Sequence, residues 1–135
     1  MANASDYLEQ QIFNHIFRDD TFTKPSNIYI GLTQDVPLDD GTYTEMPDAN
    51  GYARYANASG DATWAAHSDT SSNLVEFAFP QAAGDWGTAS GVIITDSATH
   101  SAGNVLMQGA LTTPKLIENG DTFRFSIGDL DISVS

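Results

Sequence analysis

The sequence has no cysteine and very few basic residues. It contains 135 residues, with 5 Lys and Arg against 18 Asp and Glu, so the formal net charge is −13. The absence of cysteine excludes disulfides, zinc sites built on thiolates and cysteine nucleophiles. The shortage of positive charge opposes binding to DNA, RNA and anionic membranes, because like charges repel at long range. We therefore predict that the protein binds neither nucleic acid nor membrane.

Recognisable catalytic signatures are also missing. The sequence has no glycine-rich phosphate loop, no dinucleotide-binding fingerprint, no nucleophile elbow and no helical zinc pair. Its three histidines, His15, His67 and His100, lie far apart, so only the tertiary fold could assemble a relay with Ser and a carboxylate. No run approaches the ~18 apolar residues that a membrane-spanning helix needs, and residues 1–8 do not resemble a secretory signal. These absences predict a protein that is not an enzyme and has no cofactor.

The sequence does contain enough apolar material for one folded core. Apolar residues make up 41% of the chain and aromatic residues 10%, whereas charged residues make up only 17%. A chain of this length can bury roughly two-thirds of its unfolded surface. No composition shift or internal repeat divides the chain, so we predict a single domain over residues 1–135.

The first segment has the pattern of an amphipathic helix. Ser5 is a suitable N-cap, and Asp6 and Glu9 place negative charge in the first turn, where the helix dipole favours it. Arg18 places positive charge at the other end. The apolar residues between these ends recur at helical spacing, and they are Leu8, Ile12, Phe13, Ile16 and Phe17. We predict a helix over about residues 5–18.

The rest of the chain has the alternation of β-strands. Short apolar and alternating segments end in Gly, Pro, Asn or Asp, which are the residues of turns. The predicted strands cover residues 28–32, 52–58, 74–79, 89–95, 105–111, 122–127 and 130–134. We expect Pro80 and Pro114 to end the strands that precede them, because proline cannot donate a ladder hydrogen bond. The pattern predicts a mainly β fold, a β-sandwich or compact barrel with one N-terminal α-helix.

Residues 34–51 form a long acidic segment with several Gly and Pro residues. Hard cations bind clustered oxygen atoms, so Asp39, Asp40 and nearby carbonyl groups offer ligands for Ca²⁺. The segment lacks the alternating Asp and Asn spacing of a calcium loop, and adjacent carboxylates on a loop rarely flank a sugar as they do in glycosidases. We expect a solvated acidic loop without a metal, and calcium binding is the alternative.

Two tryptophans and three residues of the acidic segment are the candidate interface residues. Trp64 lies among small polar residues, where a large aromatic side chain suits a contact with another chain. Trp86, in the sequence Gly-Asp-Trp-Gly, either closes one end of the core or stacks on a sugar. We add Asp39, Asp40 and Tyr43 to the predicted interface.

A series of short motifs runs in order along nearly the whole chain. The motifs are Met1–Glu9, Pro25, Ile28–Leu32, Gly51–Arg54, Phe79–Pro80, Asp85–Gly87, Gly109–Lys115, Asn119–Thr122 and Gly128–Leu130. In this order they resemble a family of small virion structural proteins of tailed bacteriophages. Members of such families are tail-fibre or minor tail proteins, and similar small β proteins cement capsids. The resemblance implies a virion structural role and carries over no catalytic or binding residue.

From these observations we expect a capsid decoration protein on the outside of the shell. Its partners would be the major capsid protein and itself, as a homotrimer, and its negative charge would keep particles apart. The first alternative is a tail-fibre or minor tail protein, although the chain lacks the repeats of a fibre shaft. The second alternative is a carbohydrate-binding module or hydrolase on the virion that uses Trp64 or Trp86.

Overall fold

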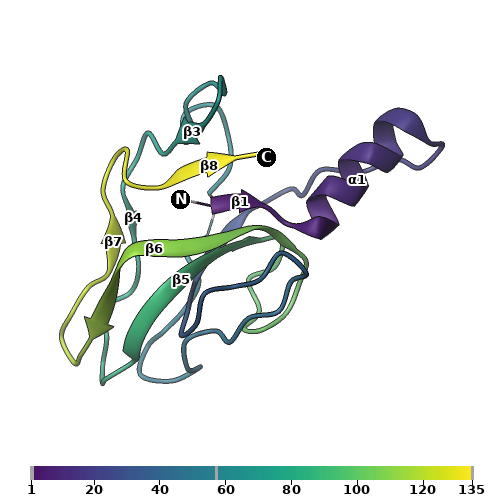
Figure 1. Ribbon diagram of the computed structural model, residues 1–135. Helices are drawn as coiled ribbons and strands as arrows, with labels where there is room; N and C mark the ends of the chain where they lie inside the picture. The colour runs from purple at the N-terminus through teal and green to yellow at the C-terminus, as the bar shows by residue number, and fades with distance from the viewer. Residues whose placement is uncertain (1, 57, 135) are drawn as a thin grey trace.

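The computed structural model describes residues 2–56 and 58–134, and it is mainly β with one N-terminal helix (Figure 1). Strands account for 33% of the chain and helix for 9%, which confirms the predicted fold class. In chain order the elements are β1 (Ala2–Ala4), α1 (Asp6–Phe17), β2 (Tyr29–Thr33), β3 (Ser71–Ser72), β4 (Phe77–Ala78), β5 (Gly87–Thr95), β6 (Val105–Ile117), β7 (Arg124–Phe125) and β8 (Asp131–Ser133).

Two sheets form within the described residues, and they do not close into a barrel. The larger sheet has six strands in the order β2-β5-β6-β1-β8-β3, and the smaller sheet pairs β4 with β7. β1 lies between β6 and β8, antiparallel to the first and parallel to the second. The two ends of the described chain therefore lie side by side within the larger sheet (Figure 1).

One face of the larger sheet carries the hydrophobic core. β2 and β5 pair so that Ile30 lies opposite Ile94 and Leu32 opposite Val92, and all four side chains are buried. The smaller sheet contributes Phe77, which is fully buried in the same cluster. The core therefore joins the two sheets through apolar contacts. Strands with period-two alternation have one apolar face, and that face is buried between the sheets.

The acidic segment 34–51 is held along the free edge of β2. The backbone N–H of Met46 donates to the carbonyl of Leu32 at 3.0 Å, and the N–H of Gln34 donates to the carbonyl of Thr44 at 2.8 Å. Met46 is fully buried. The segment is therefore part of the folded body.

Residues 52–58, which we predicted as a strand, do not form one in the described part of the chain. Tyr55 makes an isolated bridge with Ile30, and Asn57 lies outside the described residues. The alternation of Tyr52 and Arg54 reflects a different cause, because both side chains turn inward to a buried polar network. Alternation of residue types indicates that every second side chain is buried. A strand is one conformation that does this, and an irregular segment such as residues 52–56 is another.

β6 is longer than predicted, because it continues past Pro114 to Ile117. The β5–β6 ladder is irregular between Ala89 and Gly91, where residues 110–115 of β6 lie opposite three residues of β5. A proline in such an irregularity removes no ladder hydrogen bond, so it does not end the strand.

The remaining differences concern short elements. β1 and β3 were not predicted, because segments of three and two residues are too short to show alternation. The predicted strands 74–79 and 122–127 shorten to β4 and β7. Tertiary pairing sets the ends of such strands, and local sequence does not.

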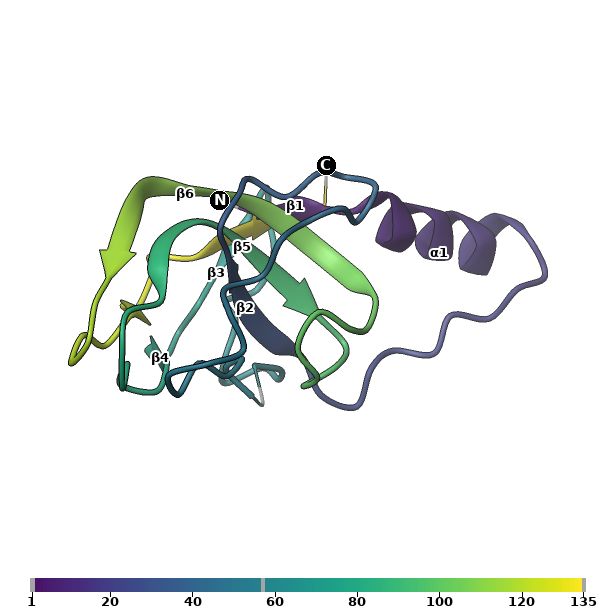
Figure 2. The same ribbon diagram turned by 90° about the horizontal axis from the view of Figure 1, so that it is seen from below.

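The helix forms where the sequence predicted it, with Ser5 as N-cap and Arg18 as C-cap. Its placement is unusual, because none of its twelve residues is buried. Figures 1 and 2 show α1 extending away from the β body, followed by a long segment that returns to β2. At the base of α1, Leu8 is partly buried against the core, whereas the apolar side chains of the far half are exposed.

Candidate functional site

The base of α1 is firmly attached to the sheet. The Ser5 side chain is 1% exposed, and its hydroxyl donates to the carbonyl of Val105 and accepts a hydrogen bond from the N–H of Leu8 at 3.2 Å. The backbone N–H of Ser5 donates to Leu106 O at 2.9 Å, and the N–H of Asp6 donates to Asp39 O at 2.8 Å. These contacts fix the direction in which the helix leaves the body.

The far half of α1 presents apolar side chains to solvent. Phe13 is 55% exposed, Ile16 62% and Phe17 73%. The rings of Phe13 and Phe17 contact each other, with centroids 5.2 Å apart. Three large apolar side chains on adjacent turns form a contiguous surface of the kind that marks a protein–protein contact. We call this surface the α1 tip.

A second apolar feature is a groove beside the segment that returns from α1. Its narrow part has a volume of about 300 Å³, with a floor of Ile94, Leu106, Met107 and Ile132 and walls that include Ile28 and Trp64. A wider part of about 570 Å³ shares Ile28, Trp64 and Ala65 with the narrow part. We call the two parts together the Trp64 groove.

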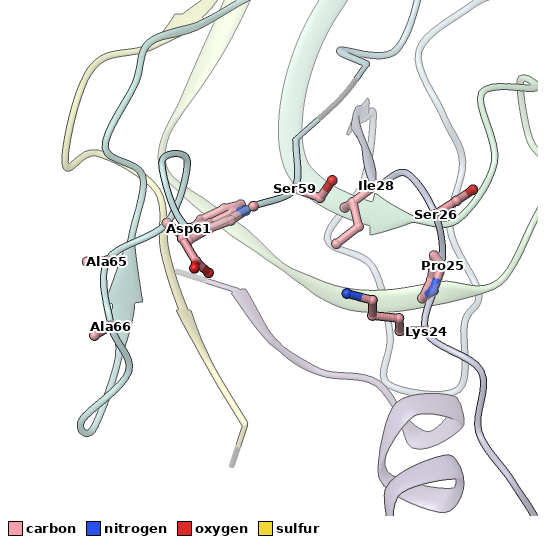
Figure 3. A pocket seen from close by; sticks show the side chains of 10 residues that line it. Lys24, Pro25, Ser26, Ile28, Ser59, Asp61, Ala65 and Ala66 are labelled. Carbon is pink, nitrogen blue, oxygen red and sulfur yellow. The ribbon is translucent and has the colours of Figure 1, made fainter.

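Figure 3 shows the wider part of the Trp64 groove from close by. Lys24 and Pro25 lie on one side of the groove, and Asp61 and Ala65 lie on the opposite side. The Lys24 side chain extends into the opening (Figure 3). The groove therefore combines an apolar floor with a charged rim, which is the usual composition of an interface core and its edge.

Trp64 is held in place by the body, and it lines the groove with the rest of its surface. Its indole N–H donates to the carbonyl of Ala58 at 2.7 Å, and its ring lies 5.4 Å from that of Phe77 in an edge-on arrangement. Of the predicted interface residues, Trp64 is thus the one placed at a hollow with an apolar floor.

Trp86 is placed differently. It is 3% exposed, its indole N–H donates to the carbonyl of Asn50 at 2.9 Å, and its ring meets that of Tyr52 edge-on at 5.2 Å. Trp86 therefore belongs to the core and leaves almost no surface for a sugar or a partner chain.

The three acidic-segment residues of the predicted interface are each engaged within the chain. The Asp39 carboxylate accepts a hydrogen bond from the Gln108 amide, and Tyr43 accepts one from Arg54 at 3.2 Å. Asp40 is fully exposed, and hydrogen bonds from Thr42 lower the pKa of its carboxyl group. The structure does not bring these residues together with Trp64.

Sequence reasoning missed a buried ion pair between Glu45 and Arg54. Arg54 Nη2 lies 2.8 Å from Glu45 Oε1, and the side chains are 1% exposed for Arg54 and 0% for Glu45. Arg54 Nη1 also donates to Thr95 Oγ1 and to the carbonyls of Ser97 and Ala102 at 2.7–2.9 Å. Each guanidinium nitrogen has a partner, so this pair joins the acidic segment to the turn after β5.

The ion pair sets the protonation state of Glu45. Burial by itself raises the pKa of the Glu45 carboxyl group, but hydrogen bonds from Arg54, Tyr52 and the Ser101 N–H outweigh that effect, so the pKa lies below its ordinary value. Burial and the nearby Glu45 carboxylate raise the pKa of the Tyr52 hydroxyl. Glu45 is therefore ionised and Tyr52 is neutral at pH 7.

The groups beside this pair do not assemble a nucleophilic relay. Ser101 Oγ lies 3.1 Å from His100 Nδ1, but His100 Nε2 lies 2.6 Å from the backbone carbonyl of Met46. In a Ser-His-Asp triad a carboxylate accepts from that second nitrogen, orients the ring and stabilises its charge. The nearby Glu45 carboxylate is already bound to Arg54, Tyr52 and the Ser101 N–H. His100 and Ser101 therefore join the turn after β5 to the acidic segment through Met46 and Glu45.

Metal binding and membrane insertion can be judged for residues 2–56 and 58–134. They hold no group of three or more His, Asp or Glu side chains placed to bind one metal ion. None of the helical segments in that part of the chain has the length and apolar character to cross a bilayer.

The described structure is thus that of a small, acidic β protein that presents an apolar helix and an apolar groove to solvent. The chain belongs to the Podophage GP4 fiber I protein gp80 family, whose sequence model matches residues 3–133. This is a family of bacteriophage virion structural proteins, so the resemblance to tailed-phage virion proteins is confirmed. A comparison with curated proteins finds no match.

Proposed function

We propose that this protein is a structural subunit of a podophage tail fibre, and that it acts by binding neighbouring virion proteins. The observation that carries this proposal is the family match, which covers residues 3–133 and bears the name of a fibre protein. The matched range includes the helix, the groove and the β body.

The geometry supports a binding role. The helix base is fixed to the sheet by buried hydrogen bonds, whereas the α1 tip is exposed. A rigid attachment loses little conformational entropy when its tip is bound, which favours stable association. The chain is also short and without repeats, so it fits a connecting or terminal piece of a fibre better than a long shaft.

Capsid decoration, our first expectation from the sequence, stays a competing prediction. It rests on the net charge of −13 and on the small repeat-free chain. Its expected partner, the major capsid protein, differs from that of a fibre subunit. The position of the protein in the virion therefore separates the two hypotheses.

The test is to purify virions, separate heads from tails, and count this protein in each fraction by quantitative mass spectrometry. We expect it in the tail fraction at low copy number, and gold-labelled antibodies should mark the fibres in electron micrographs. Recovery of hundreds of copies with the heads would overturn the fibre assignment and favour decoration.

A pair of variants tests whether α1 is the attachment element. Phe13→Asp with Phe17→Asp should abolish incorporation into virions while leaving the circular dichroism of the β body unchanged. Ile127→Asp is the matched control, because Ile127 is an equally exposed apolar residue at 67% but does not lie on α1. Equal loss of incorporation in both variants would contradict a specific role for the helix.

A further inference from the structure

We propose that a slot between β6 and β7 binds an extended, uncharged segment of a different virion protein, which adds to the free edge of β6 as a further strand. The slot has a volume of about 390 Å³, and most of its lining comes from residues 110–113 of β6 and residues 123–125 at β7. We call it the β6–β7 slot. The class of partner rests on the proposed function, whereas the main-chain chemistry of the slot does not.

The first argument is that β6 has an edge without a partner. On this edge β1 pairs with Met107 and Gln108 alone, and no other strand within residues 2–56 and 58–134 joins it. Towards β5, the register passes directly from Ala110 to Lys115, so the four residues between them have no counterpart in β5. An unpaired edge presents a row of N–H and C=O groups, and an added strand binds to such a row.

The opposite wall of the slot is also the edge of a strand. In the described part of the chain β7 pairs with β4 and with no other strand, so its second edge is open as well. An extended segment between the two walls therefore meets main-chain groups on both sides. Residues 110–113 cover about 13 Å, which is room for about four residues of added strand.

The base of the slot is apolar. Val92 is fully buried and Leu130 is 1% exposed, and Leu111 and Phe123 pack partly buried against the same core. Successive side chains of a strand point to opposite faces. An added strand therefore places every second side chain on this apolar base, which gives a requirement for apolar residues at alternate positions.

The local charge favours an uncharged occupant. The lining has one basic and one acidic side chain, Arg124 and Asp129, so it has no net charge in a chain of charge −13. Arg124 also forms an ion pair with Glu76 at 3.5 Å, which leaves no uncompensated positive charge to attract an acidic segment. A single exposed carboxylate such as that of Asp129 attracts a basic segment only weakly.

The open edge is short, and it lies away from α1. Pro114 and Lys115 follow it directly, and these residue types oppose the pairing of identical edges that leads to aggregation. Figures 1 and 2 show the end of β6 on the side of the body opposite to α1. A subunit held by the α1 tip therefore leaves the β6–β7 slot open to a second neighbour, as a connecting piece of a fibre requires.

Amide hydrogen exchange tests the proposal directly, because an added strand protects backbone N–H groups. The free full-length protein would be compared with the same protein in purified virions. Residues 110–113 should exchange at least ten times more slowly in the virions, whereas the turn at residues 98–103, which does not line the slot, is the reference. Equal exchange of residues 110–113 in the two samples would overturn the proposal.

A matched pair of variants separates strand addition from a general effect of charge. Thr112→Asp and Thr99→Asp each add one negative charge at an exposed threonine, and only Thr112 lines the slot. A charge on the edge opposes strand addition. Incorporation into virions should fall at least tenfold for Thr112→Asp and stay unchanged for Thr99→Asp, with the same circular dichroism in both. Equal incorporation of the two variants would contradict the proposal.

The absence of cysteine allows the occupant to be identified in virions. Thr113→Cys would be labelled with a benzophenone maleimide, irradiated in the particle and mapped by mass spectrometry, with Thr99→Cys as the control. We expect cross-links concentrated in one short uncharged segment of a different virion protein. Cross-links to a second copy of this chain, or the same distribution from both positions, would overturn the proposal.

The outcomes also separate this proposal from the fibre assignment. Protection of residues 110–113 in particles that carry the protein on their heads would refute the fibre assignment and support strand addition. A protein that is found in the tail fraction and exchanges as fast there as when free would support the fibre assignment and refute strand addition.

Discussion

The β body and helix α1 differ in whether their interacting side chains have partners within the chain. In the body, the buried charges of Glu45 and Arg54 are fully engaged by partners from the same chain. In α1, Phe13 and Phe17 remain largely exposed although they have the spacing of a core-forming face. The contrast shows that an apolar stripe on a helix indicates a partner surface without indicating that this surface belongs to the same chain.

The largest effect should come from breaking the ion pair in the body. Arg54→Met leaves the Glu45 carboxylate buried without its counter-charge, and we expect a loss of about 3–5 kcal/mol in the free energy of unfolding. Urea unfolding followed by circular dichroism measures it.

The control for that variant is Arg124→Met. Arg124 forms an ion pair with Glu76 at 3.5 Å, and both side chains are about half exposed. Exposed pairs contribute less than about 1 kcal/mol. Similar losses in the two variants would show that burial of the Glu45–Arg54 pair is not what stabilises the body.

Acid should weaken the body through the same pair. The pKa of Glu45 is lower in the folded chain than in the unfolded chain, so in the acidic range the folded state binds fewer protons than the unfolded state does. The stabilisation is present above the unfolded pKa of about 4.3 and is lost as the pH falls through the lower folded pKa. Urea unfolding over a pH series should show this loss, and Glu45→Gln should flatten it. The same slope in both proteins would rule out Glu45 as the cause.

The junction between the two regions should give an intermediate effect. Ser5→Ala removes the N-cap of α1 and the hydroxyl bonded to Val105, which should cost about 1–2 kcal/mol. Thermal unfolding measures the loss, and amide hydrogen exchange should be fastest in α1. The exposed Ser126→Ala is the control, and protection of α1 unchanged from the parent would contradict the role given to the cap.

The smallest effect on stability should come from the α1 tip. Phe17→Asp changes a side chain that is 73% exposed, so the free energy of unfolding should shift by less than about 0.5 kcal/mol. The same change should strongly reduce incorporation of the protein into virions, as quantitative mass spectrometry of purified particles would show. A large loss of stability in a dilute monomer would mean that α1 packs on its own body.

Parts of this fold were predictable because their causes are local. Ser5, the first-turn acids and the apolar spacing specify α1 within a few residues, since capping and helical periodicity act over one or two turns. The strands β2 and β5 were predicted because their alternating or continuous apolar residues span five or more positions.

The candidate sites were less accessible to sequence reasoning. Glu45 and Arg54 are nine residues apart in segments that do not look alike, and only folding brings them together. One signal was present, because Arg54 occupies an inward position among Tyr52 and Ala56 in a chain with few basic residues. The groove is formed by residues from 24 to 132, and no local pattern encodes such a surface.

The sequence by itself therefore determined the class of fold, the helix and the family. Tertiary structure alone decided that the apolar side chains of the far half of α1 are exposed, that Trp86 is buried and that Trp64 lines a groove. The physical reason is that periodicity and capping depend on neighbours along the chain, whereas burial depends on which distant segments fill the space beside a side chain.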